Sequence, residues 1–89
     1  MKVIKIGAPW CSGCLVMGPR WEKVEHDNPW LKTEYLNFDE DTEKVKKYKV
    51  DEKLPVFIFL SKGDREIDRK VGEITEEEIL ELINKYKDK

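Results

Sequence analysis

The stretch Ala8-Pro9-Trp10-Cys11-Ser12-Gly13-Cys14 contains both cysteines of the chain and leads from a short apolar segment into a helical pattern. After it, apolar side chains recur at helical spacing, at Cys14, Met17, Trp21 and Val24. Cys11 should therefore lie at or just before the first turn, where its sulfur can accept from unpaired backbone N–H groups near the positive end of the helix dipole. That position favours the thiolate, the reactive form of cysteine. Cys14 falls on the inward stripe, so we expect one reactive and one sheltered cysteine, which together form a dithiol couple.

The composition limits the size and the surroundings of the protein. Its 89 residues allow one small domain, 1–89, with a formal net charge of −2. A surface without basic excess argues against nucleic acid as a partner, and no apolar run approaches the roughly 18 residues of a membrane helix. The apolar N-terminus, interrupted by Lys5, is too short for a signal-peptide core, so we expect a cytoplasmic protein. Thiols are kept reduced there, which favours a catalytic or metal-binding role for the cysteines over a structural disulfide.

The pattern along the chain predicts an α/β domain in the order β-α-β-α-β-β-α. The expected elements are strands near 3–6, 33–38, 54–60 and 66–71, a helix over 12–26, a second helix through 48 capped by Asp41 or Thr42, and a last helix capped by Thr75. The continuous apolar run 54–60 favours a central strand buried on both faces, and the charges along 66–71 suit an edge strand. A helix between the first two strands makes them parallel, and a tight turn makes the last two a hairpin. The sheet should therefore be four-stranded and mixed.

Several residues outside the cysteine pair resemble those of one known family, the thioredoxins and their glutaredoxin-like relatives. The shared features are an Ala-x-Trp-Cys-x-x-Cys motif, a proline inside the following helix, an aliphatic residue and a cis-proline before the buried strand, a Val-Gly near the end of the last strand, and a Leu-x-x-Asp. In this chain they are Ala8, Trp10, Cys11, Cys14, Pro19, Leu54-Pro55, Val71-Gly72, Leu36 and Asp39. A lone Cys-x-x-Cys is weakly specific, but this combination is strongly specific and covers nearly the whole chain. It implies a thioredoxin fold, with the four-stranded mixed sheet flanked by helices.

The resemblance also implies an activity, that of a thiol–disulfide oxidoreductase of the protein-disulfide reductase type. Cys11 would be the nucleophile that forms a mixed disulfide, and Cys14 the resolving cysteine. The residues implied in substrate binding surround this pair: Trp10, Ser12, Gly13, Leu54, Pro55, Val71 and Gly72. We expect no metal and no cofactor besides the redox-active disulfide of the pair. The implied partners of a monomer are disulfide-bearing proteins and a thioredoxin-reductase-like electron donor, with neither nucleic acid nor membrane.

Departures from the family leave alternatives open. Where thioredoxins resemble one another in a buried acid, this chain has Lys5, and the basic partner of that acid corresponds to Tyr35. Lys5 either lowers the pKa of Cys14 by proximity or extends its ammonium to the surface. A glutathione-dependent, glutaredoxin-like reductase is a second function, which is weakened because Lys53-Leu54 and Val71-Gly72-Glu73 replace the Thr-Val and Gly-Gly-acid implied for it. A non-enzymatic docking or metal-binding module is the third, and two cysteines fall short of the four ligands of a closed tetrahedral site.

Overall fold

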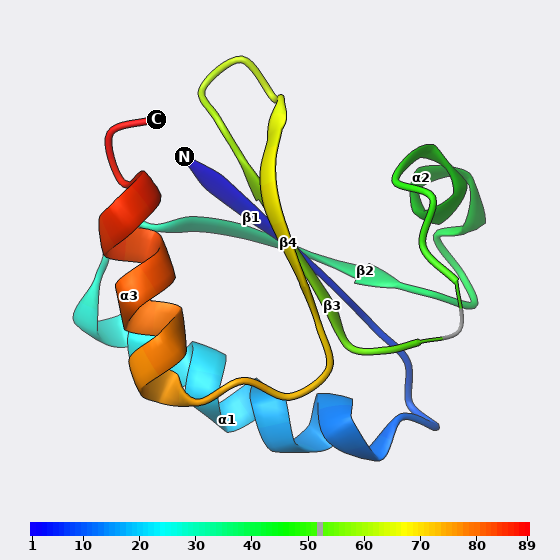
Figure 1. Cartoon of the computed structure of the whole chain (residues 1–89). Helices are drawn as coiled ribbons and strands as arrows, with labels where there is room; N and C mark the ends of the chain where they lie inside the picture. The colour runs from blue at the N-terminus through cyan, green and yellow to red at the C-terminus, as the bar shows by residue number, and fades with distance from the viewer. Residues whose placement is uncertain (52) are drawn as a thin grey trace.

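The computed structural model of the chain describes residues 1–51 and 53–89 and has the predicted order of elements (Figure 1). The elements are β1 Lys2–Gly7, α1 Ser12–Asp27, β2 Lys32–Asn37, α2 Thr42–Lys47, β3 Val56–Leu60, β4 Glu66–Val71 and α3 Glu76–Tyr86. Their bounds lie within two residues of the predicted ones. Within the described part of the chain, the helices are too short or too polar to cross a membrane.

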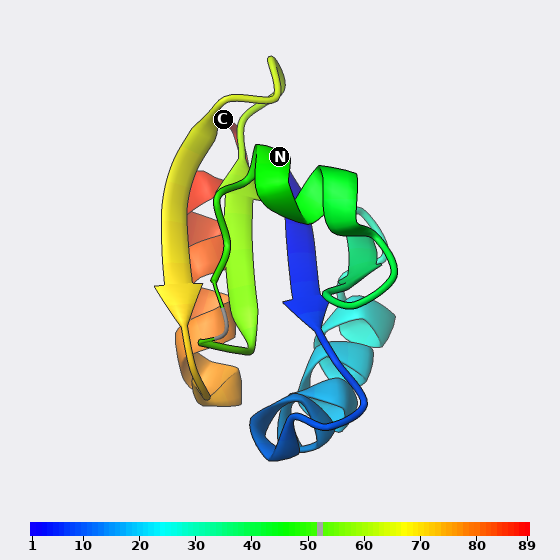
Figure 2. The same ribbon diagram turned by 90° about the vertical axis from the view of Figure 1, so that its right-hand side faces the viewer.

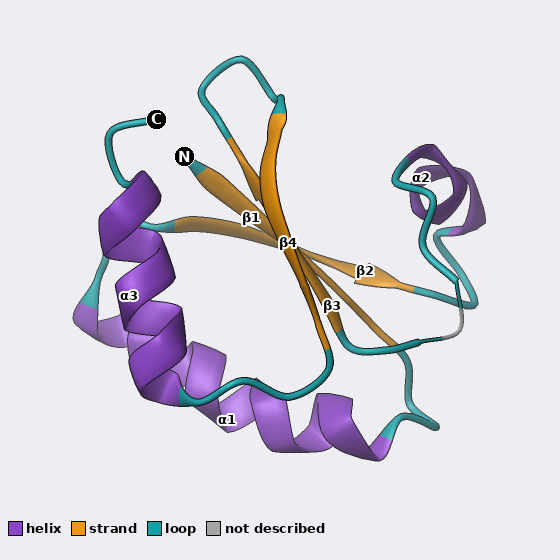
Figure 3. Cartoon of the chain, in the orientation of Figure 1, coloured by secondary structure: helices purple, strands orange, loops and turns teal. Residues whose placement is uncertain are grey.

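The strands form one mixed sheet in the order β2-β1-β3-β4, drawn in orange in Figure 3. β1 and β2 are parallel, because α1 crosses between them. β3 is antiparallel to both of its neighbours, β1 and β4. The predicted arrangement is confirmed: β3 is interior with all five residues buried, and the charged strand β4 lies at an edge.

The helices cover the sheet in two layers, with α1 and α3 on one face and α2 on the other (Figures 1 and 2). Successive strand side chains point to opposite faces, so β1 and β3 each contribute to both layers. Phe59 packs in the core beneath α1 and α3, whereas Ile58 packs with Val45 of α2. On α1, the predicted inward stripe is confirmed for Met17, Trp21 and Val24, all of which are buried.

The helix caps agree with the sequence prediction at α3 and differ at α2. Thr75 Oγ1 accepts from Glu78 N at 3.1 Å, so the predicted cap of α3 is confirmed. Asp41 is the N-cap residue of α2, but its side chain makes no capping hydrogen bond. Its carboxylate instead accepts from Asn37 N at 2.7 Å and closes the turn that follows β2. The predicted position of the cap at Asp41 is therefore confirmed, but the side-chain hydrogen bond expected of a cap is absent, because the carboxylate accepts from the Asn37 N–H instead.

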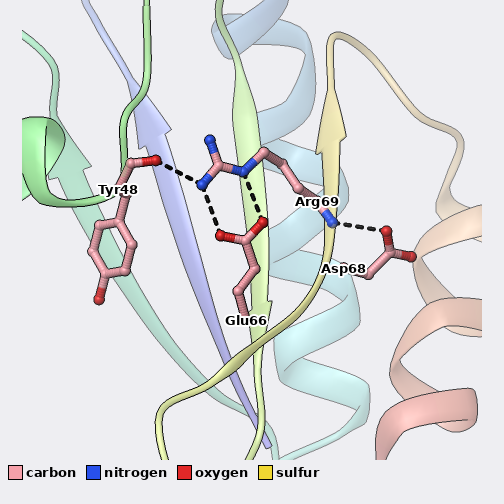
Figure 4. A network of polar contacts seen from close by, with 4 residues as sticks. All are labelled: Tyr48, Glu66, Asp68 and Arg69. Atoms are coloured by element: carbon pink, nitrogen blue, oxygen red, sulfur yellow. Dashed lines mark hydrogen bonds and ion pairs between the residues drawn. The ribbon is translucent and has the colours of Figure 1, made fainter.

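Arg69 holds the edge strand β4 to the loop after α2, as Figure 4 shows. Its Nε and Nη2 atoms donate to the Glu66 carboxylate at 3.1 and 2.8 Å, and Nη2 also donates to the Tyr48 carbonyl at 2.6 Å. Such a bidentate arginine–carboxylate pair is stronger than a single surface ion pair. The charges of β4 thus fix the position of the edge strand as well as keeping it polar.

Candidate active site

Cys11 lies where the sequence places it, at the N-cap of α1. Its Sγ accepts from the backbone N–H of Cys14 at 3.2 Å, and its own N–H donates to the Ala8 carbonyl at 3.1 Å. Negative charge on this sulfur is therefore favoured by a backbone donor and by the helix dipole. The two cysteines are not bonded to each other, so the structure describes the dithiol form.

Cys14 lies in the first turn of α1, and its pKa is raised from 9.0 to about 11. Burial is the largest cause, because it disfavours the charged thiolate, and the hydrogen bond to Cys11 adds to it. The Cys14 thiol therefore keeps its proton at neutral pH, as a sheltered cysteine should. In exposure, however, the expected order is reversed: Cys11 is 7% exposed, while Cys14 is half-buried. The loops at Trp10, Pro55 and Gly72 surround Cys11, and the helical pattern alone could not reveal them.

We expect the reduced protein to lose stability as the pH rises from 9.0 towards about 11. A thiol whose pKa is higher in the folded state binds its proton more tightly there, so its stabilising contribution is complete below the unfolded pKa and vanishes above the folded one. Urea unfolding of the reduced protein across this window measures the effect. Cys14→Ser is the control, because it keeps every lysine and tyrosine but removes this thiol. Identical pH profiles for the two proteins would contradict the assignment.

The residues expected to bind substrate lie close together around Cys11. One surface pocket of about 350 Å³ is lined by Trp10, Cys11, Ser12, Gly13, Leu54, Pro55, Gly72 and Glu73. Val71, at the end of β4, is 54% exposed but does not line this pocket. Glu73 was not among the predicted site residues. Its side chain lies against Gly13: a Cβ on Gly13 would be 3.4 Å from Glu73 Cγ.

The Leu54-Pro55 loop contacts the cysteine motif directly, since a Cβ on Gly13 would lie 3.1 Å from Pro55 Cδ. The peptide bond between Leu54 and Pro55 is cis, as the resemblance implied. The Pro55 carbonyl accepts from Gly72 N at 2.7 Å, and Gly72 has φ of 92°, in the region that favours glycine. Pro55 has no N–H to donate and its carbonyl already accepts one hydrogen bond, so Leu54 is the residue of this dipeptide that offers both an N–H and a carbonyl to a substrate.

Trp10 is an exposed side chain that is nevertheless fixed in place. Its Nε1 donates to Asp39 Oδ2 at 2.8 Å, and its ring meets that of Phe38 edge-on at 6.1 Å. Asp39 is the acid of the Leu-x-x-Asp match, and its hydrogen bond orients the tryptophan next to Cys11. Trp10 as a whole is 57% exposed, so its indole remains available for contact.

Lys5 forms an ion pair that the sequence did not predict. Its Nζ lies 2.9 Å from Glu25 Oε2, its side chain is only 18% exposed, and Thr33 Oγ1 also donates to Glu25. The pKa of Cys14 is raised, and Lys5 is not among the causes. The expectation that Lys5 lowers this pKa is therefore wrong, because Glu25 already neutralises the ammonium. The alternative expectation, that Lys5 extends its ammonium to the surface, holds only in part. The ammonium ends in the ion pair with Glu25, and both side chains are largely buried.

A cysteine at a helix start, a second cysteine one turn later and a cis-proline beside the motif are typical of a protein of thiol–disulfide exchange. The family model "Thioredoxin" matches residues 1–85. The chain therefore belongs to the thioredoxin family, whose members are thiol–disulfide oxidoreductases.

Individual relatives agree with this family assignment. The chain is 30% identical over 79 residues to a thioredoxin of Chlamydia pneumoniae, covering 89% of this chain and 76% of that protein. It is 28% identical over 81 residues to a thioredoxin of Mycoplasmoides gallisepticum, with 91% and 79% covered. Among solved structures, thioredoxin of Fasciola hepatica superposes with a TM-score of 0.86 at 28% identity, covering 96% of this chain and 79% of that one. The predicted fold is thus confirmed.

Proposed function

We propose that this protein reduces the disulfide bonds of other proteins, with Cys11 as the nucleophile and Cys14 as the resolving cysteine. The asymmetry of the pair is the observation that carries the proposal. Negative charge on Cys11 Sγ is supported by a backbone N–H at 3.2 Å, whereas the pKa of Cys14 is raised to about 11. One sulfur is thus suited to attack, and the other keeps its proton until the second step.

The proposed reaction transfers two electrons from the cysteine pair to the substrate. The Cys11 thiolate attacks one sulfur of the substrate disulfide, and the other substrate sulfur leaves as a thiolate that takes a proton from solvent. Cys14 then releases its proton to solvent and attacks Cys11 Sγ. The Cys11–Cys14 bond forms as the bond between Cys11 and the substrate breaks, and the second substrate sulfur leaves as a thiolate. A thioredoxin-reductase-like flavoprotein would return the two electrons. No other cofactor takes part in the proposed cycle.

A protein substrate would bind as an extended segment beside the Leu54-Pro55 loop. Because Pro55 has no N–H and its carbonyl already accepts from Gly72, pairing in the manner of an added strand would use the N–H and carbonyl of Leu54. The exposed indole of Trp10 and the exposed side chain of Val71 would supply apolar contact on either side. Ser12, Gly13 and Gly72 would leave room for the substrate to approach Cys11.

The residues around Cys11 match the glutathione-dependent alternative only in part. Gly72 and Glu73 keep the second glycine and the acid of the Gly-Gly-acid sequence implied for it, but Val71 replaces the first glycine, and Lys53-Leu54 replaces the Thr-Val. Glu73 lines the pocket, and its carboxylate oxygen Oε2 would be 3.7 Å from a Cβ on Gly13. A carboxylate beside Cys11 favours protein segments of basic character.

The proposed function predicts that the reduced protein reduces a disulfide-bearing protein faster than it reduces a glutathione mixed disulfide on the same carrier. Equilibration with dithiothreitol buffers should give the pair a potential near that of a reductase, about −270 mV. A potential of about −120 to −180 mV would instead indicate an oxidant or isomerase. A cysteine pair that does not cycle would exclude the oxidoreductase and favour a binding module.

A further inference from the structure

A second pocket lies on the other side of the cysteine motif, against Cys14. It has a volume of about 180 Å³, which is enough for several water molecules. Its lining residues are contributed by β1, β2, α1 and the region of Pro55: Lys5, Ile6, Gly7, Cys14, Met17, Gly18, Trp21, Glu22, Tyr35, Pro55 and Phe57. The Cys14 sulfur therefore faces a small, mostly apolar space, with polar groups from Lys5, Glu22 and Tyr35 at its walls, which is separate from the pocket around Cys11.

Lys5 lines this pocket, but its Nζ donates to Glu25 Oε2 at 2.9 Å and is not directed at Cys14 by any hydrogen bond of the described residues. Glu25 in turn accepts from Thr33 Oγ1. Lys5, Glu25 and Thr33 are thus hydrogen-bonded to one another. A hydrogen-bond donor for the Cys14 sulfur must therefore come from another lining residue of the pocket.

Tyr35 is the lining residue whose hydroxyl is placed to donate such a bond. It pairs with Lys5 across the β1–β2 ladder, so both side chains lie on the face of the sheet that α1 covers. A Cβ on Gly7 would lie 2.9 Å from Cys14 Sγ and 3.2 Å from Tyr35 Oη. The sulfur and the hydroxyl therefore border the same small space above Gly7, which is open because glycine has no side chain.

The hydroxyl of Tyr35 is suited to donate rather than to ionise. Its pKa is raised, first by burial and then by negative charge on Cys14 and Cys11. A neutral phenol beside a thiolate is a hydrogen-bond donor. Negative charge on Cys14 raises the pKa of Tyr35, and by the same interaction the Tyr35 hydroxyl stabilises negative charge on the Cys14 sulfur.

We propose that the Tyr35 hydroxyl donates a hydrogen bond, directly or through one water of this pocket, to the Cys14 thiolate that attacks the mixed disulfide. The inference rests on the proposed function. In this step the proton of Cys14 passes to water, the Cys14–Cys11 bond forms, the bond between Cys11 and the substrate sulfur breaks, and the substrate leaves as a thiolate. Tyr35 keeps its own proton throughout and lowers the cost of charge on Cys14 Sγ.

Other titratable groups also face Cys14 and Tyr35. Lys5 faces it from β1, Glu22 from α1 and Cys11 from the helix start, while Asp41 acts on Tyr35 from the start of α2. Trp21 also lines the pocket, and its buried Nε1 has no partner within the described part of the chain. A water hydrogen-bonded within this pocket would be in keeping with such a group.

The test compares Tyr35→Phe with the unsubstituted protein and with Tyr48→Phe. Tyr35 is 56% exposed on an edge strand, so removal of its hydroxyl should leave the fold intact. Tyr48 is the matched control, because it binds Arg69 through its backbone carbonyl. Its hydroxyl points away from Arg69 (Figure 4), so Tyr48→Phe should leave that hydrogen bond in place. The probe is 5,5′-dithiobis(2-nitrobenzoate), which releases one coloured thiolate when Cys11 attacks and a second when Cys14 resolves the adduct.

We expect Tyr35→Phe to slow the second release about tenfold, as loss of a hydrogen bond to a charged group would, and to leave the first unchanged. The pH midpoint of the second release should rise by about one unit, and Tyr48→Phe should change neither phase. An unaltered second phase and midpoint, or equal slowing of both phases, would overturn the role of Tyr35. Absence of a second phase in the unsubstituted protein would overturn the proposed mechanism itself, so the two failures are distinguishable.

Discussion

Cys11→Ser is expected to lower the reduction of a protein disulfide to the rate measured without protein. A serine hydroxyl at the N-cap can still accept from Cys14 N, so the helix start should remain folded. It cannot form the thiolate that attacks the substrate, and Cys14, with its pKa raised to about 11, is a poor substitute. The measurement is the initial rate of reduction with dithiothreitol as the electron donor.

Cys14→Ser is the matched control for this experiment, because it leaves the nucleophile and removes only the resolving step. When the reduced variant is freed of dithiothreitol before it meets the substrate, we expect it to accumulate a mixed disulfide between Cys11 and the substrate, detectable as an added mass. A mixed disulfide at Cys14 in the Cys11→Ser variant, or turnover by that variant well above background, would contradict the assigned roles.

The largest loss of stability is expected from Phe59→Ala, about 3–5 kcal/mol in the free energy of unfolding. Phe59 of β3 is fully buried, and the centroid of its ring lies 5.9 Å from that of Tyr86 on α3. Truncation leaves a cavity between the sheet and that helix, and surrounding side chains close it only in part. Small domains are stable by about 5–15 kcal/mol, so the variant would lose a large share of its stability.

Urea unfolding under one fixed redox condition measures this loss. Phe38→Ala is the matched control: Phe38 is only half-buried and packs against the exposed Trp10, so its loss should be clearly smaller. Equal losses for the two variants would contradict the assignment of Phe59 to the centre of the core.

Hydrophobic periodicity predicted the elements of this protein, because it records which face of each element is buried. The alternation at helical spacing placed Met17, Trp21 and Val24 inward, and the unbroken apolar run ending at Leu60 indicated an interior strand. The cap interaction of Cys11 was equally predictable, since the sulfur and the N–H that it accepts belong to residues three apart in sequence.

The surroundings of the cysteines depended on tertiary structure. Cys11 is more buried than Cys14 because loops distant in sequence, at Pro55 and Gly72, close around it. The Asp41 carboxylate accepts from the Asn37 N–H and not from the first turn of α2. The side-chain rotamer and the loop geometry decide between donors that a sequence pattern treats alike.

The sequence by itself determined the element order, the position of Cys11 at the start of α1 and the family, since these depend on local spacing and short motifs. Only the tertiary structure decided what the space behind Cys14 contains. The Lys5–Glu25 pair joins residues 20 apart on different elements, and Tyr35 meets Cys14 over Gly7 through the register of β1 and β2. Such contacts depend on register and side-chain direction, which a local pattern of apolar and polar residues does not encode.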